Sequence, residues 1–410
     1  MRLKDLFITI CAVSALFPAI SAQAGEFKAK PSIMLGMEHN DNVFLERYAR
    51  NSDYISKARP TLNLGYKASS LKLGTGYSYD YRHYLNGSRD DTETQDANLA
   101  AEAVFIENML YLKASDVYTR TTLDSTRDTT GENFDVNQSD RNTVIINPYL
   151  VLRLDPLSDL TLSYTRTGTW YKEAEGIDKR EEAVSVEVSR ELSETTRVNA
   201  GHRYSRESDR TGGYVRRDAY AGAVYGRGSE LGLSLKGGYT WLDPEFGKSY
   251  SRLFWETSLF RDFTAVKATL SSVSSVVENP LSTPQWRMTH SAELSKRTDT
   301  ASMKLSFYLH EYRGMEERAL QTRVYGNRGS LMYDLTGDLK GAFDYTIEKS
   351  EHRRAHTHTV RGLLSPGLTY SISADDTLTF AYNYASYKSP ELGTDNYKNN
   401  RFTIELRVNF

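Results

Sequence analysis

The chain has 410 residues, of which 25% are charged and 39% hydrophobic, and its formal net charge is -2 at pH 7. This balanced charge gives no support to a nucleic-acid partner. The sequence has one cysteine, Cys11, which excludes an internal disulfide and a multi-cysteine metal site. Its 28 Tyr residues suit a surface that is apolar on one side and wet on the other.

Residues 1–24 predict a cleavable signal peptide. Arg2 and Lys4 form a short basic region, an apolar run extends from Leu6 to Phe17, and the small residues before Ala24 match a cleavage site. The apolar run is too short to cross about 30 Å of hydrocarbon as a helix. We therefore expect cleavage after Ala24, which also removes Cys11, and a mature domain over residues 25–410.

The rest of the chain alternates apolar and polar residues up to its last residue. In the final segment Phe402, Ile404 and Leu406 alternate with Thr403 and Glu405, and the segments 184–189, 231–241 and 339–348 follow the same pattern. No later stretch approaches 18 consecutive apolar residues, so a membrane would be crossed by strands. We interpret Phe410, which ends the last strand, as the C-terminal signal for insertion by the barrel-assembly machinery.

The connections between these segments predict a membrane barrel. Short turns rich in Gly, Asp, Asn and Ser alternate with longer polar loops, as in bacterial outer-membrane barrels. The turns are predicted at 69–70, 107–108, 155–159, 193–195, 226–229, 262–263, 298–300, 336–338 and 373–375. The loops are predicted at 41–52, 86–95, 121–140, 173–179, 208–213, 243–248, 277–284, 313–322, 350–357 and 388–397.

This count predicts an all-β fold: a transmembrane up-and-down antiparallel barrel of about 20 strands, with 18 as the alternative. We expect it in the outer membrane of a Gram-negative bacterium, in contact with outer-membrane lipid, with both termini in the periplasm. The leader from Gly25 to Lys30 is too short for a plug domain. The longest loop, 121–140, could either fold into the lumen or extend outside.

One face of the alternating strands is polar and should line the lumen. Its charges are of both signs, which would suit either a charged solute or polymer or simply a hydrated interior. The candidates for this lining are Arg59, Lys72, Asp80, Arg82, Arg153, Glu187, Lys236, Arg287, Lys340, Asp344, Arg361, Glu405 and Arg407.

The sequence offers little evidence for catalysis. His352, His356 and His358 lie close together in a predicted loop, where a metal site is one interpretation and a solvated charged loop is the one we favour. No nucleophile elbow, zinc-binding motif or phosphate-binding loop occurs. We therefore expect no enzyme activity, no metal and no cofactor.

The first strands after the signal peptide carry a distinctive run of motifs. This run resembles the start of the β-barrel porin 2 family over roughly the first 60 mature residues, at Pro31-Ser32-Ile33, Asn40 to Phe44, Ser52-Asp53, Arg59-Pro60 and the strand at 61–66. The resemblance implies an outer-membrane barrel associated with exopolysaccharide or capsule gene clusters. Its partners would be a secreted polysaccharide and the export proteins of that polymer.

Three polar residues in this run have two physical interpretations. Asp41, Asn42 and Asp53 could bind Ca²⁺ or hold a turn by side-chain hydrogen bonds, and we favour the turn.

The leading functional hypothesis is a passive conduit, or an accessory, for export of a surface polysaccharide. The alternatives are a general or solute-selective porin, a barrel that binds polysaccharide at the surface, and a barrel hydrolase. The sequence leaves the cargo, the oligomeric state and the gating open.

Overall fold

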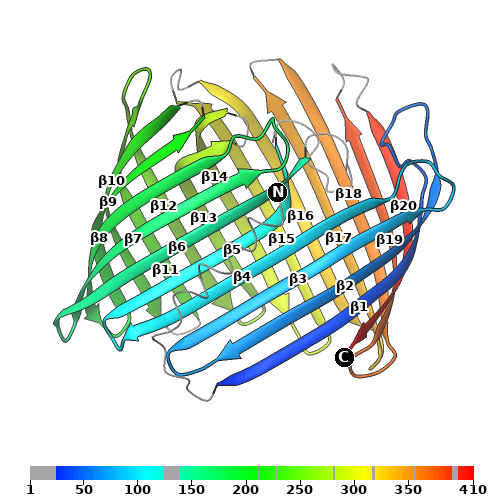
Figure 1. Ribbon diagram of the computed structural model, residues 1–410, viewed down its shortest axis with the longest axis horizontal. Coiled ribbons are helices and arrows are strands. Elements are labelled where there is room, and N and C mark those ends of the chain that lie inside the picture. Colours follow the sequence, from blue (N-terminus) through cyan, green and yellow to red (C-terminus); the bar gives the residue numbers. More distant parts are fainter. Residues whose placement is uncertain are drawn as a thin grey trace.

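The computed structural model describes residues 25–123, 138–210, 212–227, 230–279, 282–315, 319–353, 356–389 and 396–410. Within these residues the chain forms one closed sheet of 20 antiparallel strands (Figure 1), which confirms the predicted fold and strand count. The predicted signal peptide and the central part of loop 121–140 lie outside the described residues. The described residues contain no helix that is long and apolar enough to cross a membrane.

The strands follow one another around the barrel in chain order. They are β1 (Glu26–Asn40), β2 (Asp53–Lys67), β3 (Leu71–Tyr84), β4 (Thr92–Ile106), β5 (Leu110–Thr122), β6 (Gln138–Asp155), β7 (Ser158–Tyr171), β8 (Lys179–Ser193), β9 (Thr196–Asp209), β10 (Gly212–Arg227), β11 (Leu231–Pro244), β12 (Tyr250–Phe263), β13 (Val266–Asn279), β14 (Ser282–Arg297), β15 (Ala301–Gly314), β16 (Leu320–Asp334), β17 (Leu339–His352), β18 (Thr357–Ser371), β19 (Thr377–Lys388) and β20 (Tyr397–Asn409).

The pairing of β1 with β20 closes the barrel. These strands pair from Ser32 opposite Asn409 to Asn40 opposite Arg401, and we call this junction the seam. Every other junction joins strands that are consecutive in the chain. The seam therefore has no linking turn of its own, and closure depends on noncovalent contacts.

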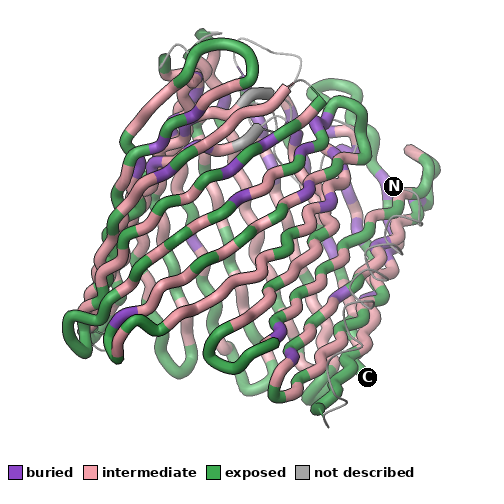
Figure 2. Tube along the Cα trace, turned by 60° about the vertical axis from the view of Figure 1, so that its left-hand side comes forward, coloured by how far each residue is buried: buried purple, intermediate pink, exposed green. Residues whose placement is uncertain are grey.

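The two ends of the barrel differ in their connections. At one end, which we call the turn end, tight turns such as residues 68–70 and 107–109 link the strands, and β1 begins and β20 ends there (Figure 1). The opposite end, the long-loop end, carries longer connections such as 41–52 and 389–396. Buried residues gather toward the long-loop end (Figure 2).

Three predicted connections need correction. The expected loops at 208–213 and 277–284 are short, because β9 continues to Asp209 before β10 starts at Gly212, and β13 continues to Asn279 before β14 starts at Ser282. The polar residues there still form backbone hydrogen bonds between the strands, because this pairing does not require apolar side chains. The turn expected at 262–263 follows Phe263 instead, because both residues belong to β12.

Candidate functional site: the inner wall of the barrel

The strand register determines which side chains share a face of the closed sheet. Met34 lies directly opposite both Arg59 and Arg407, and Lys236 lies opposite Glu256. Followed around the barrel with alternation along each strand, this register places all thirteen candidate lining residues on one face. The other face exposes an apolar band that includes Leu62, Leu162, Val186, Phe343 and Ile404. We assign the apolar band to lipid and the polar face to the lumen.

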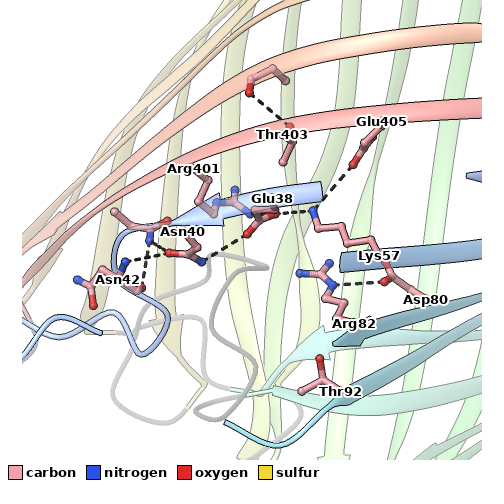
Figure 3. Close-up of polar contacts among 12 residues, drawn as sticks. Glu38, Asn40, Asn42, Lys57, Asp80, Arg82, Thr92, Arg401, Thr403 and Glu405 are labelled. Carbon is pink, nitrogen blue, oxygen red and sulfur yellow. Dashed lines mark hydrogen bonds and ion pairs between the residues drawn. The ribbon is translucent and has the colours of Figure 1, made fainter. Parts of the chain in front are cut away.

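Buried charges lie across the seam on this polar face (Figure 3). Glu38 of β1 forms an ion pair with Lys57 of β2, and their side chains are only 1% and 7% exposed. From β20, Arg401 lies 3.9 Å from the Glu38 carboxylate, and Glu405 lies 3.9 Å from the Lys57 ammonium. The predicted lining residue Glu405 thus belongs to an ion-pair network that links both sides of the seam.

Three further predicted residues meet beside this network. The Asp80 side chain, 4% exposed, accepts hydrogen bonds from Arg59 and, at 3.3 Å, from Nε of Arg82. One carboxylate between two guanidinium groups fixes the wall formed by β2 and β3.

A second set of polar contacts joins the ends of β1 and β20. The Asn400 backbone N–H and side-chain amide donate to the Asp41 carboxylate at 2.7 and 2.6 Å. The Asn399 amide donates to Asn40 Oδ1 at 2.5 Å and to the Asn42 carbonyl at 3.0 Å. We call Asn40, Asp41, Asn42, Asn399 and Asn400 the seam clasp.

The residues considered for Ca²⁺ instead make hydrogen bonds that join separate strands and loops. Asn42 does close its own loop through Glu46, but its amide also donates to the Lys398 carbonyl at 2.9 Å. Asp53 accepts the backbone N–H groups of Asn86 and Ser88 at 2.8 and 3.0 Å. Sequence reasoning identified side-chain hydrogen bonds here but missed that most of them reach other strands and loops.

The loop that follows the seam clasp also covers the seam with apolar side chains. Leu45 packs with Ala385, Tyr387 and Tyr397 of β19 and β20. On the other side of the seam, Val43 packs with Ile55 and Tyr84 of β2 and β3. These partners lie on the polar face, so the loop between β1 and β2 contacts the inner wall on both sides of the seam.

Two tyrosines form an aromatic surface on the same inner face. The rings of Tyr111 and Tyr149 stack with centroids 4.9 Å apart and an interplanar angle of 11°. The Lys113 ammonium lies 5.4 Å from the Tyr149 ring and pairs with Glu102. We call this group, with Lys72, which also pairs with Glu102, the tyrosine platform. The sequence indicated only that its many tyrosines suit a half-wet surface and did not single these two out.

The other predicted lining residues are distributed over the remaining wall. Glu187 accepts hydrogen bonds from Tyr220 and Asn199 at 2.9 and 3.0 Å, and Lys236 lies 4.4 Å from the Tyr220 ring. Arg361 pairs with Glu348 at 3.2 Å.

The remaining predicted charges form exposed ion pairs or no ion pair. Arg153 and Lys340 form exposed ion pairs with neighbouring carboxylates at 3.6 and 3.8 Å. Among the described residues, no ion pair involves Arg287, Asp344 or Arg407. The wall therefore combines paired charges with unpaired charges of both signs rather than a stripe of one sign.

The predicted histidine cluster spans β17 and β18. His352 ends β17, His358 lies in β18, and the connection between them is only partly described. In the part of the chain that the structure describes, no group of three or more His, Cys, Asp or Glu residues is arranged to hold a metal.

No protein-family model matches the chain, and no curated protein matches it. Solved structures do resemble it. The ferric enterobactin receptor PfeA of Pseudomonas aeruginosa has 9% identity and a TM-score of 0.50, covering 95% of this chain and 82% of that one. The FrpB iron transporter of Neisseria meningitidis has 9% identity and a TM-score of 0.49, covering 93% and 82%. The outer membrane protein opdK of Pseudomonas aeruginosa has 11% identity and a TM-score of 0.43, covering 93% and 99%.

At this level of identity the likeness concerns the fold alone. The chain has the closed antiparallel fold of outer-membrane β-barrels.

Proposed function

Given this fold, we propose that the chain is an outer-membrane conduit for a secreted surface polysaccharide, with the turn end in the periplasm and the long-loop end outside. The observation that carries the proposal is the inner wall: a closed barrel of 20 strands whose inner face is polar around its circumference. Barrels of 16–18 strands already leave an aqueous channel, so this one has room for a hydrated chain.

The tyrosine platform supports a sugar as cargo. Flat aromatic faces pack against the apolar faces of sugar rings, while neighbouring charged groups can bind their hydroxyl groups. Tyr111 and Tyr149 present such faces, and Glu102 and Lys113 lie beside them. The resemblance of the first strands to barrels associated with exopolysaccharide clusters points to the same cargo.

Single-channel conductance of the refolded barrel in a planar bilayer tests this function. We expect a large conductance that the host's own surface polysaccharide blocks. The variant Tyr149→Ala should weaken this block several-fold, whereas Tyr164→Ala, on the apolar face, should leave it unchanged.

Two results would contradict the conduit. Conductance without any block by the polymer would favour a solute porin, and a folded barrel without conductance would favour a protein that binds polysaccharide at the surface. Heat-dependent migration in SDS gels confirms folding in each case.

A further inference from the structure

The apolar face of β7, β8 and β9 ends in a row of charged residues near the long-loop end. Arg166 lies directly opposite Glu182, which in turn lies opposite Arg206. The adjacent row toward the turn end holds Tyr164, Val184 and Tyr204 opposite one another, and all three are exposed. Since an exposed apolar row faces lipid, the charged row lies where hydrocarbon gives way to lipid headgroups.

The arginines of this row are not neutralised by the protein. The one carboxylate between them, Glu182, accepts a hydrogen bond from Arg180 at 2.5 Å. Among the described residues, no ion pair involves Arg166 or Arg206.

Other arginines near the long-loop end of the same outer face are paired. Glu311 binds both Arg313, at 2.9 Å, and Arg323, at 2.5 Å, and Arg217 contacts Asp243. An unpaired arginine beside lipid headgroups contributes about fivefold, or about 1 kcal/mol, to the binding of an anionic lipid close to it. The row on β7–β9 is therefore suited to bind an external anion.

A cavity of about 570 Å³ lies against this row. Ile146 and Trp170 give it an apolar wall, and Arg166 and Arg180 give it basic side chains. Basic residues outnumber acidic ones in its lining, with Arg166, Lys179, Arg180 and Arg210 against Glu173, Asp178 and Asp209. The cavity thus combines an apolar surface, continuous with the lipid-facing band, with arginines at its border.

We propose that this cavity binds the phosphate-bearing headgroup of a membrane lipid, with an acyl chain along Ile146 and Val184. Arginine suits this ligand because its planar guanidinium donates two parallel hydrogen bonds to a phosphate. Arginines that border both the cavity and the exposed apolar row of Tyr164, Val184 and Tyr204 match an amphiphile better than a free anion or a soluble polymer. The proposal rests on the membrane placement proposed above, which makes this lipid the phosphorylated glycolipid of the outer leaflet, and does not depend on conduction.

Titration of fluorescent lipid A into the refolded barrel in neutral detergent micelles tests the site. The double variant R166Q/R206Q should lower the affinity roughly tenfold or more, since a basic residue near an anionic lipid contributes about fivefold. The charge-preserving R166K/R206K variant should retain most of the affinity. The matched control R323Q, at an outward arginine already bound by Glu311, should change it less than twofold.

Competition distinguishes the sources of phosphate. We expect lipid A with its phosphates removed to bind as weakly to the native barrel as lipid A binds to R166Q/R206Q. Unchanged affinity in R166Q/R206Q would overturn the proposal. Displacement of lipid A by equal concentrations of inorganic phosphate or of an acidic polysaccharide would overturn it as well. Conductance of R166Q/R206Q should equal that of the native barrel, so loss of lipid binding is separable from failure of the conduit.

Discussion

Asn42 lies at the centre of the seam clasp and is fully buried. Its amide makes hydrogen bonds to its own loop and to β20, so one side chain both shapes the loop and secures closure. Asparagine suits this position because it can donate and accept at once.

Removing this side chain should weaken the closed barrel. We expect Asn42→Ala to lower the free energy of unfolding by about 2–3 kcal/mol, because it removes the side-chain hydrogen bonds of Asn42 to backbone groups of Glu46 and Lys398. Urea unfolding of the refolded barrel in lipid vesicles measures the change. Asn147→Ala is the control: it removes two hydrogen bonds, to the Tyr164 carbonyl and the Thr165 hydroxyl, but Asn147 is only partly buried and water can replace them, so the loss should stay below about 1 kcal/mol. Equal losses in the two variants would contradict a special role for the clasp.

The ion-pair network at the seam also holds strands together through buried side chains, in this case charged ones. Glu38 and Lys57 are both buried, and the desolvation of each is compensated mainly by the other, with Arg401 and Glu405 as second partners at 3.9 Å. Sequence reasoning recognised Glu405 and Arg59 as inner-wall candidates by alternation but gave no reason to select Glu38 or Lys57 as partners across the seam. Alternation fixes a face, whereas pairing partners depend on the register between strands that are distant in the sequence.

At the scale of the strand, β20 differs from the strands before it because it pairs with β1, at the other end of the chain. The residue after it, Phe410, is exposed and donates its backbone N–H to the Pro31 carbonyl at 3.0 Å. The backbone of Phe410 thus extends the seam, while its side chain remains free to be recognised.

Deleting Phe410 should therefore separate assembly from stability. We expect the shortened chain to refold in detergent with a midpoint of thermal unfolding within a few degrees of that of the full chain. In cells, its folded fraction in the outer membrane should fall several-fold, because the terminal aromatic would no longer be recognised for insertion. Quantifying the heat-modifiable band in outer-membrane fractions measures this. Equal folded fractions for both chains would refute the role assigned to Phe410.

The boundaries of the strands show where sequence reasoning succeeds and where it fails. Turns such as 298–300 were predicted correctly because Asp and Thr interrupt the alternation abruptly there. At 208–213 and 277–284 the polar residues predicted as loops instead extend β9, β10, β13 and β14. Outside the hydrocarbon a strand needs only backbone pairing, so polarity no longer marks its end.

At the scale of the whole molecule, the charges on the inner wall determine the electric field in the lumen. Inner carboxylates such as Asp80, Glu102 and Glu348 are each bound by a cation or a tyrosine hydroxyl. The thirteen lining candidates comprise nine Lys or Arg and four Asp or Glu, and among the described residues no ion pair involves Arg287, Arg407 or Asp344. The field inside the lumen should therefore be positive on average.

This field predicts the ion selectivity of the proposed conduit. In a KCl gradient across a planar bilayer, the reversal potential should show a preference for chloride over potassium. The double variant Arg287→Gln/Arg407→Gln should shift the reversal potential toward zero, whereas Arg323→Gln, on the outer face, should leave it in place. A native pore that prefers potassium would contradict this description of the lumen.

The noncovalent seam has a topological consequence. The end of β20 meets β1 at the turn end of the barrel. At this end nine further pairs of neighbouring strands, from β2 and β3 to β18 and β19, are each joined by a short connection. The order of strands around the barrel is therefore cyclic, and the position of the chain ends is one choice among ten equivalent gaps at that end. A circular permutant could link the present termini and open the chain at residues 298–300. Every strand would keep its neighbours, and the seam would become an ordinary hairpin. The barrel would then be closed by the noncovalent pairing of β14 with β15.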